Sequence, residues 1–173
     1  MIRLLKVFSV LDNAVSKVLG ILVSFTVGAL IVVVTIQVFA RYVLFKSIGG
    51  VEEMPISLMM IGVWLGAPLV ARADMHLKIE LLELIIKNKA LAARILKTVV
   101  HVIILVCLCL FTRFALIYVQ GSYAMYDITP GLNMPIWWMH SLLFISALLM
   151  AIYYFTHVVR DVIALKGGAK TWS

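Results

Sequence analysis

Residues 18–40 read VLGILVSFTVGALIVVVTIQVFA, a run with no charged side chain between Lys17 and Arg41. A helix of about 20 residues crosses a hydrocarbon core of about 30 Å, because each residue adds about 1.5 Å. The run exceeds this length, and it is too long for the apolar part of a cleaved signal peptide, which takes about 7–15 residues. It therefore predicts a retained membrane-spanning helix over residues 18–41.

Three further apolar stretches follow along the chain. Residues 54–72, 96–119 and 135–160 carry few charges, and Pro135 marks the start of the last one because proline is tolerated in a first helical turn. The composition agrees, since 64% of the residues are hydrophobic and 13% are charged, about half the charge of an ordinary soluble domain. The sequence predicts an all-α integral membrane protein with four transmembrane helices in one domain, residues 1–173.

Positive charge is distributed unevenly between the two sides of these spans. Twelve of the fifteen Lys and Arg residues fall in the N-terminal segment, the connection between the second and third spans, and the C-terminus. Cytoplasmic connections carry the excess of Lys and Arg, so both termini are expected in the cytoplasm. The net charge of +7 then faces anionic lipid at the membrane edge, and nucleic acid is not an expected partner.

Two segments outside the spans have the pattern of helices that lie in the membrane interface. In residues 1–17 and 74–94, polar side chains repeat at helical spacing on one face and apolar ones occupy the other. Residues 74–94 form one such helix or two, or alternatively an ordinary soluble helix packed beneath the spans. Residues 161–173 are expected to be a cytoplasmic tail. The side chains expected at the lipid interface are Arg3, Lys6, Lys87, Arg94 and Trp138.

The predicted spans contain almost no side chain suited to chemistry. No Asp or Glu falls within them, which leaves ion and proton pathways without a carboxylate. Arg113, near the end of the third span, is expected to reach the interface by snorkelling. Cys107 and Cys109 point to different sides of one helix and cannot share a metal. We therefore assign no catalytic, metal or cofactor residue and do not expect an enzyme.

Histidine supplies an alternative hypothesis. His101 lies about one turn into the third span and His157 about one turn from the end of the fourth, at a similar depth. Two histidines on facing helices are what a bis-imidazole haem requires, so a haem-binding anchor subunit of a respiratory enzyme stays open. A small self-sufficient transporter is a third hypothesis, although the chain lacks the internal repeats and broken helices of secondary carriers.

Two pairs of residues, one just before the second span and one within it, are candidates for contacts within the chain or with a partner. Glu52 and Glu53 precede that span, where negative charge either caps the helix or meets cations of a partner. Gly62 and Gly66 form a GxxxG pattern, which lets helix backbones approach closely. The pattern serves packing within the chain or against a partner.

Several short motifs in a fixed order resemble one known family. They are Glu52-Glu53, Trp64-Leu65-Gly66-Ala67, Arg72, His76, Ile79-Glu80-Leu81-Leu82 and Thr129-Pro130-Gly131-Leu132-Asn133-Met134-Pro135-Ile136-Trp137. With the four spans, they resemble the small membrane subunit (DctQ or SiaQ type) of tripartite ATP-independent periplasmic (TRAP) transporters over nearly the whole chain. One departure is that Gly49, Gly50 and Val51 stand where the family often has Trp before the paired acids.

The resemblance implies a non-catalytic accessory role in the bacterial inner membrane. In the family, a large multi-span subunit carries the sodium and substrate sites and moves as an elevator, while a periplasmic substrate-binding protein delivers an organic acid. The small subunit would be a scaffold in contact with both proteins and with membrane lipids. Residues 43–53 and 121–135 would help to dock the periplasmic protein, and the substrate would be a sialic acid or a dicarboxylate. The residues expected at partner interfaces are Glu52, Glu53, Gly62, Trp64, Gly66, Arg72, His76, Pro130, Pro135 and Trp137.

Overall fold

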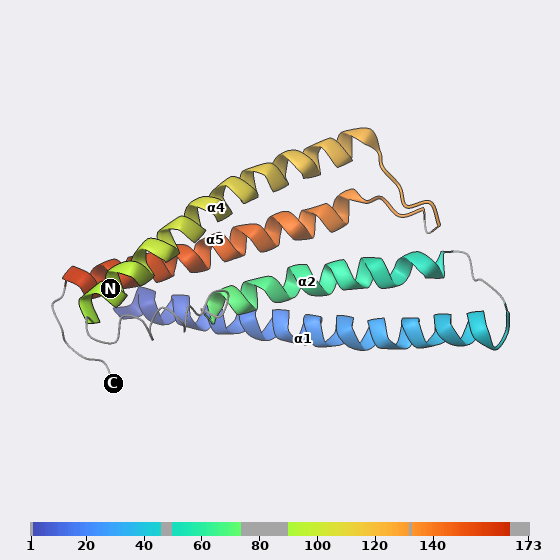
Figure 1. Ribbon diagram of the computed structural model, residues 1–173, viewed down its shortest axis with the longest axis horizontal. Helices are drawn as coiled ribbons and strands as arrows, with labels where there is room; N and C mark the ends of the chain where they lie inside the picture. The colour runs from blue at the N-terminus through green and yellow to red at the C-terminus, as the bar shows by residue number, and fades with distance from the viewer. Residues whose placement is uncertain (1, 46–49, 74–89, 132, 167–173) are drawn as a thin grey trace.

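In the part of the chain that the structure describes, the fold consists of four long helices (Figure 1). The computed structural model describes residues 2–45, 50–73, 90–131 and 133–166. Each long helix contains a segment long and apolar enough to cross a membrane, which confirms the predicted all-α membrane protein with four spanning helices. The elements are α1 (Ile2–Tyr42), the short 3₁₀ helix η1 (Val51–Glu53), α2 (Met54–Arg72), α4 (Ala90–Met125) and α5 (Trp137–Lys166).

The first helix is longer than the predicted span. α1 runs without a break from Ile2 to Tyr42, so the segment predicted to lie in the interface, residues 1–17, continues directly into the first span. Helix formation is cooperative, and nothing in the sequence between Asp12 and Lys17 breaks the backbone hydrogen bonding. The second predicted interfacial segment, residues 74–94, lies mostly outside the described residues, since the description resumes at Ala90 with α4.

The last two helices also differ from the predicted spans at their ends. α4 continues beyond residue 119 to Met125, because the sequence places no proline in that stretch. α5 begins at Trp137, two residues after the predicted start at Pro135, because Pro135 is held in an isolated antiparallel bridge with Ile128.

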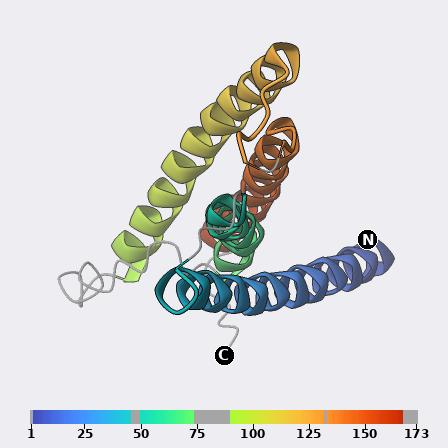
Figure 2. The same cartoon turned by 90° about the vertical axis from the view of Figure 1, so that its right-hand side faces the viewer.

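The helices pack in the order α1, α2, α5, α4. The principal contacts join α1 to α2, α2 to α5, and α5 to α4, and α1 and α4 lie on opposite sides of the central pair (Figures 1 and 2). We call the end where α1 begins and α5 ends the terminal end, and the end with η1 and residues 126–136 the loop end. In the view of Figure 1, α1 and α4 diverge towards the loop end, and Figure 2 shows that their other ends also lie on opposite sides of the molecule.

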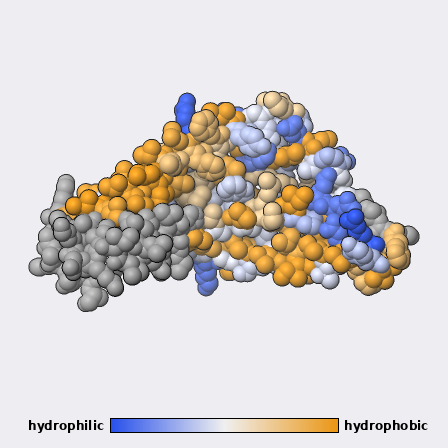
Figure 3. Space-filling model, in the orientation of Figure 1, coloured by the Kyte–Doolittle hydropathy of each residue, from blue (hydrophilic) through white to orange (hydrophobic). Residues whose placement is uncertain are grey.

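Little of the apolar helix surface is buried within the chain. Only 11%, 11%, 6% and 28% of the most apolar windows of the four spans are buried, in chain order. Apolar side chains accordingly extend over the outside of the helices (Figure 3). Soluble monomers rarely expose such continuous apolar surface, so lipid or another membrane protein must cover it. α5, the most buried helix, is the centre of the packing.

The buried core lies towards the terminal end. Ala71 of α2 and three residues of α5, Met150, Tyr153 and Tyr154, form one buried cluster. Partly buried apolar residues of α2 and α4 complete it, namely Ala67, Ile104, Leu105 and Leu108. This cluster joins three of the four helices and fixes the positions of the polar contacts described below.

Candidate functional site

At the loop end, a tight turn positions the paired acids. Gly50 has φ of 85°, a left-handed conformation that glycine adopts without steric cost, and its carbonyl accepts a hydrogen bond from the Glu53 amide at 3.3 Å. α2 then starts with Pro55 in its first turn. The Glu52 side chain is exposed, whereas Glu53 is half-buried. The two acids therefore have different surroundings.

A short hairpin follows α4 at the same end. The Thr129 amide donates to the Met134 carbonyl at 2.9 Å, and the Ile136 amide donates to the Asp127 carbonyl at 2.9 Å. Asn133 has φ of 51°, a conformation that asparagine adopts more readily than most residues. Backbone hydrogen bonds thus join the two arms of the hairpin, residues 127–131 and 133–136, which carry most of the family-like motif.

Glu53 joins this hairpin to the start of α2. The Gly131 amide donates to Glu53 Oε1 at 2.9 Å, a hydrogen bond to a charged acceptor. Gly131 is needed for close approach, because a Cβ added there would lie 2.9 Å from Gly50 Cα and 3.1 Å from Glu53 Cδ. The structure therefore brings together two segments, η1 and the hairpin, that the sequence analysis singled out separately. The other carboxylate oxygen, Oε2, is buried and has no hydrogen-bond partner among the described residues.

At the terminal end, Arg72 connects α2 to α1. Its Nη2 lies 2.8 Å from Asp12 Oδ2, and Nε donates to the same oxygen at 2.9 Å. Nη2 also donates to Asn13 Oδ1 at 2.6 Å. Tyr153 of α5, which is 8% exposed, lies beside both members of this ion pair. Arg72 was predicted at a partner interface, and the structure shows it in contacts within the chain.

The two histidines of the haem hypothesis do meet at the terminal end. Their ring centroids are 5.6 Å apart, as expected from their similar depth. His101, which is buried, lies with Nδ1 2.6 Å from Asp161 Oδ2, and His157 Nε2 lies 3.1 Å from the Ala71 carbonyl oxygen. The contacts occupy one nitrogen of each ring, and Tyr154 packs edge-on against both rings. The geometry fits a polar link between α2, α4 and α5 better than a ligand pair across a haem plane.

Other residues predicted at partner interfaces also contact the chain itself. A Cβ added to Gly62 would lie 3.6 Å from Thr26 Cγ2, and one added to Gly66 would lie 3.9 Å from Val23 Cγ2, so the GxxxG pattern lets α1 approach α2. Trp64 stacks on Phe111 of α4, with centroids 6.3 Å apart. By contrast, Cβ atoms added to Gly20 and Gly28 of α1 would meet no described atom within 4 Å.

The remaining predicted residues lie at the surface or outside the described structure. Trp137 packs edge-on against Tyr123 at 5.8 Å, and Pro130 and Pro135 are exposed. Arg94 is exposed and Trp138 is partly buried, as side chains at a lipid interface would be. His76 and Lys87 lie outside the described residues. Arg3 and Lys6 belong to α1, in a part whose side chains are not described.

Sequence reasoning missed the partners of the charged residues near the helix ends. Asp12 and Asp161 both lie outside the predicted spans, and the sequence analysis assigned neither of them a partner. Both carboxylates are used inside the molecule, 60 residues away from their partners in sequence. The sequence offered one signal for each of these contacts. A basic residue or a histidine lies at a similar depth on another helix.

These observations define the class of protein. The chain is an integral membrane protein whose four spanning helices are joined by polar contacts at both ends, and three of its carboxylates, Asp12, Glu53 and Asp161, bond within the chain. Residues 30–164 match the family described as tripartite ATP-independent periplasmic transporters, DctQ component. The chain therefore belongs to this family and is a small membrane subunit of a TRAP transporter. No curated relative matches the chain.

Proposed function

We propose that the chain is a non-catalytic scaffold for the large multi-span subunit of a sodium-coupled TRAP transporter. The observation that carries this proposal is the small share of each apolar span that the chain buries by itself, between 6% and 28%. A substrate path must be enclosed by protein, whereas these helices leave most of their surface open. Asp12, Glu53 and Asp161 are engaged in contacts within the chain. Ion and substrate sites would accordingly belong to the large subunit.

The terminal end would face the cytoplasm of a bacterial cell, in the inner membrane. Twelve of the fifteen Lys and Arg residues belong to the N-terminal segment, the connection between the second and third spans, and the C-terminus, which supports the assignment through the positive-inside rule. The loop end would then face the periplasm. Residues 1–17 and 74–94 would extend the scaffold sideways in the cytoplasmic interface.

The loop end would help to dock the periplasmic substrate-binding protein. The Glu53 to Gly131 hydrogen bond makes η1 and the hairpin a single surface, and exposed Glu52, Pro130 and Trp137 lie on these segments or next to them. Aromatic residues are enriched in specific protein interfaces, and complementary charge guides association. The transported substrate would be an organic acid, either a sialic acid or a dicarboxylate, by family resemblance.

Co-purification tests the scaffold role. The affinity-tagged chain is expressed with the genes that flank it, solubilised in mild detergent, and analysed by mass spectrometry for a large multi-span subunit. We expect a stable stoichiometric complex, and liposomes that contain the chain alone should show no substrate flux. Purification of the chain without any large subunit, or flux from the chain alone, would refute the proposal. A Soret band in the purified chain would revive the haem hypothesis.

A binding measurement tests the docking role separately. The complex is placed in lipid nanodiscs and titrated with the periplasmic protein. Glu52→Lys should lower the affinity about tenfold, which is about 1.4 kcal/mol, because it reverses a charge at the proposed contact. Lys17→Glu, a charge reversal at the terminal end, is the matched control and should leave the affinity unchanged. If both variants bind the periplasmic protein with equal affinity, the loop end is not part of the docking surface.

A further inference from the structure

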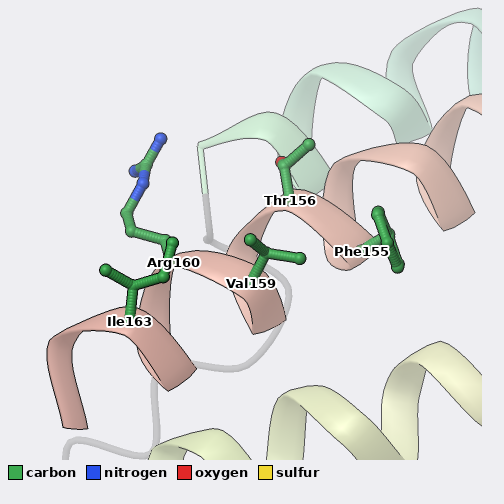
Figure 4. Close-up of a pocket in the computed structure, with 5 residues that line it drawn as sticks. All are labelled: Phe155, Thr156, Val159, Arg160 and Ile163. Carbon is green, nitrogen blue, oxygen red and sulfur yellow. The ribbon is translucent and has the colours of Figure 1, made fainter. Parts of the chain in front are cut away.

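A groove lies along the terminal half of α5. Its volume is about 330 Å³, within the range of small-molecule sites. The residues that line it form two adjacent rows on α5, with successive members of each row about one helical turn apart, and they are Phe155, Thr156, Val159, Arg160 and Ile163. Figure 4 shows the Arg160 side chain extending away from the helix beside them. None of these residues was singled out by the sequence analysis or takes part in the contacts between η1 and the hairpin.

The groove is apolar along the span and cationic towards its end. Phe155 and Val159 are 57% and 40% exposed, which leaves their apolar surface available. The Thr156 hydroxyl donates to the Tyr153 carbonyl at 2.7 Å, so its polar group is satisfied within the helix. Arg160 follows Phe155 by five residues, or about 7.5 Å along the helix axis. Apolar surface and positive charge therefore occupy different depths in the membrane.

The charge of Arg160 is not neutralised by the acidic residue next to it. Asp161 directs its carboxylate to His101 at 2.6 Å, on the side of α5 that faces α4. No other described carboxylate forms an ion pair with Arg160, and the Arg160 side chain is exposed. An anionic group at the membrane surface would complete this site.

We propose that the groove binds a phospholipid with an anionic headgroup from the surrounding leaflet. The phosphate would pair with Arg160, and an acyl chain would lie along Phe155 and Val159 towards the membrane centre. A phospholipid supplies both a negative group at interface depth and a thin apolar tail next to it. Charge complementarity and depth together thus favour a lipid.

Native mass spectrometry of the purified full-length chain tests this proposal. The chain is exchanged into detergent that contains equal amounts of phosphatidylglycerol and phosphatidylcholine with identical acyl chains. We expect bound phosphatidylglycerol to exceed phosphatidylcholine about fivefold, the preference expected of one cation near an anionic surface. Arg160→Gln should abolish the preference, and Arg41→Gln, an exposed arginine at the loop end of α1, should retain it.

A second variant tests the groove independently of charge. Val159→Trp should fill the groove and lower the retention of both lipids, while circular dichroism confirms that the exposed substitution leaves the helices intact. Equal retention of the two lipids, full preference in Arg160→Gln, or an equal loss of preference in Arg41→Gln would overturn the proposal. Loss of the lipid when the large subunit binds would also overturn it, because the groove would then be a contact between subunits.

Discussion

The two ends of the molecule are held together by different forces. At the terminal end, side chains of all four helices meet in the ion pair of Asp12 and Arg72, the contact of His101 with Asp161, and a buried core next to them. At the loop end, one hydrogen bond from a backbone amide to Glu53 connects η1 to the hairpin. Large aromatic and apolar side chains such as Phe45 and Tyr126 remain exposed there, at 87% and 83%.

This difference shows which part of the chain is organised to be rigid. Charged contacts between helices are worth most where burial excludes water, and the core beside them excludes it. The loop end has fewer contacts between helices and more surface available to a partner. We expect substitutions at the terminal end to lower stability and substitutions at the loop end to act mainly on local structure and association.

The largest effect is expected for Arg72→Ala. This variant leaves the Asp12 carboxylate, 23% exposed, without its cation, which should cost about 3 kcal/mol of unfolding free energy. Thermal unfolding in detergent, followed by circular dichroism, measures the change. Arg41→Ala, an exposed arginine at the loop end, is the control and should change stability by less than about 0.5 kcal/mol. Equal destabilisation by both variants would contradict the difference between the ends.

The next effect concerns the packing of α1 on α2. Gly62→Leu should cost about 2 kcal/mol, because its added side chain must displace Thr26, which is 6% exposed. Gly28→Leu is a matched control, since an added Cβ meets no described atom within 4 Å. The same unfolding measurement applies. If Gly28→Leu destabilises the isolated chain as much as Gly62→Leu does, the contact between Gly62 and α1 has been misassigned.

A smaller and local effect is expected for Gly131→Ala. The new Cβ, 2.9 Å from Gly50 Cα, should push the hairpin away from Glu53 and weaken that contact by about 1 kcal/mol. Hydrogen exchange of the amides in residues 127–136 should accelerate, while the melting temperature stays nearly constant. Gly121→Ala in α4 is the control, because a Cβ added there would meet no described atom within 4 Å. It should leave hydrogen exchange in the hairpin unchanged. A global fall in stability would mean that the loop end also holds the fold.

The smallest effect is expected at the contact between Trp64 and Phe111, midway between the ends. A double-mutant cycle with Trp64→Leu and Phe111→Leu should give a coupling energy of about 0.5–1 kcal/mol, because the rings stack. A parallel cycle with Trp64→Leu and Phe114→Leu should give a coupling energy near zero, because the Phe114 ring is 67% exposed. Similar coupling in both cycles would indicate a general loosening of α4 in place of a specific stacking contact.

The sequence predicted the four spans well because the hydrocarbon core demands long apolar runs. It predicted their ends less well, since hydropathy does not report the bridge between Ile128 and Pro135 that delays the start of α5. Gly62, Trp64 and Arg72 were predicted at partner interfaces, and the contacts that the structure describes for them are with α1 and α4. Residue type indicates the kind of contact, but the partner depends on which helices become neighbours.

Composition and charge alone thus determined that this is a membrane protein with four spanning helices, because the cost of exposing polar backbone to lipid leaves few alternatives. The family resemblance was likewise visible in the order of short motifs. Only the tertiary structure decided that Asp12 pairs with Arg72 and that Gly131 meets Glu53. These contacts join residues about 60 and 78 positions apart, and the packing order of the helices, which no local pattern encodes, brings them within hydrogen-bonding distance.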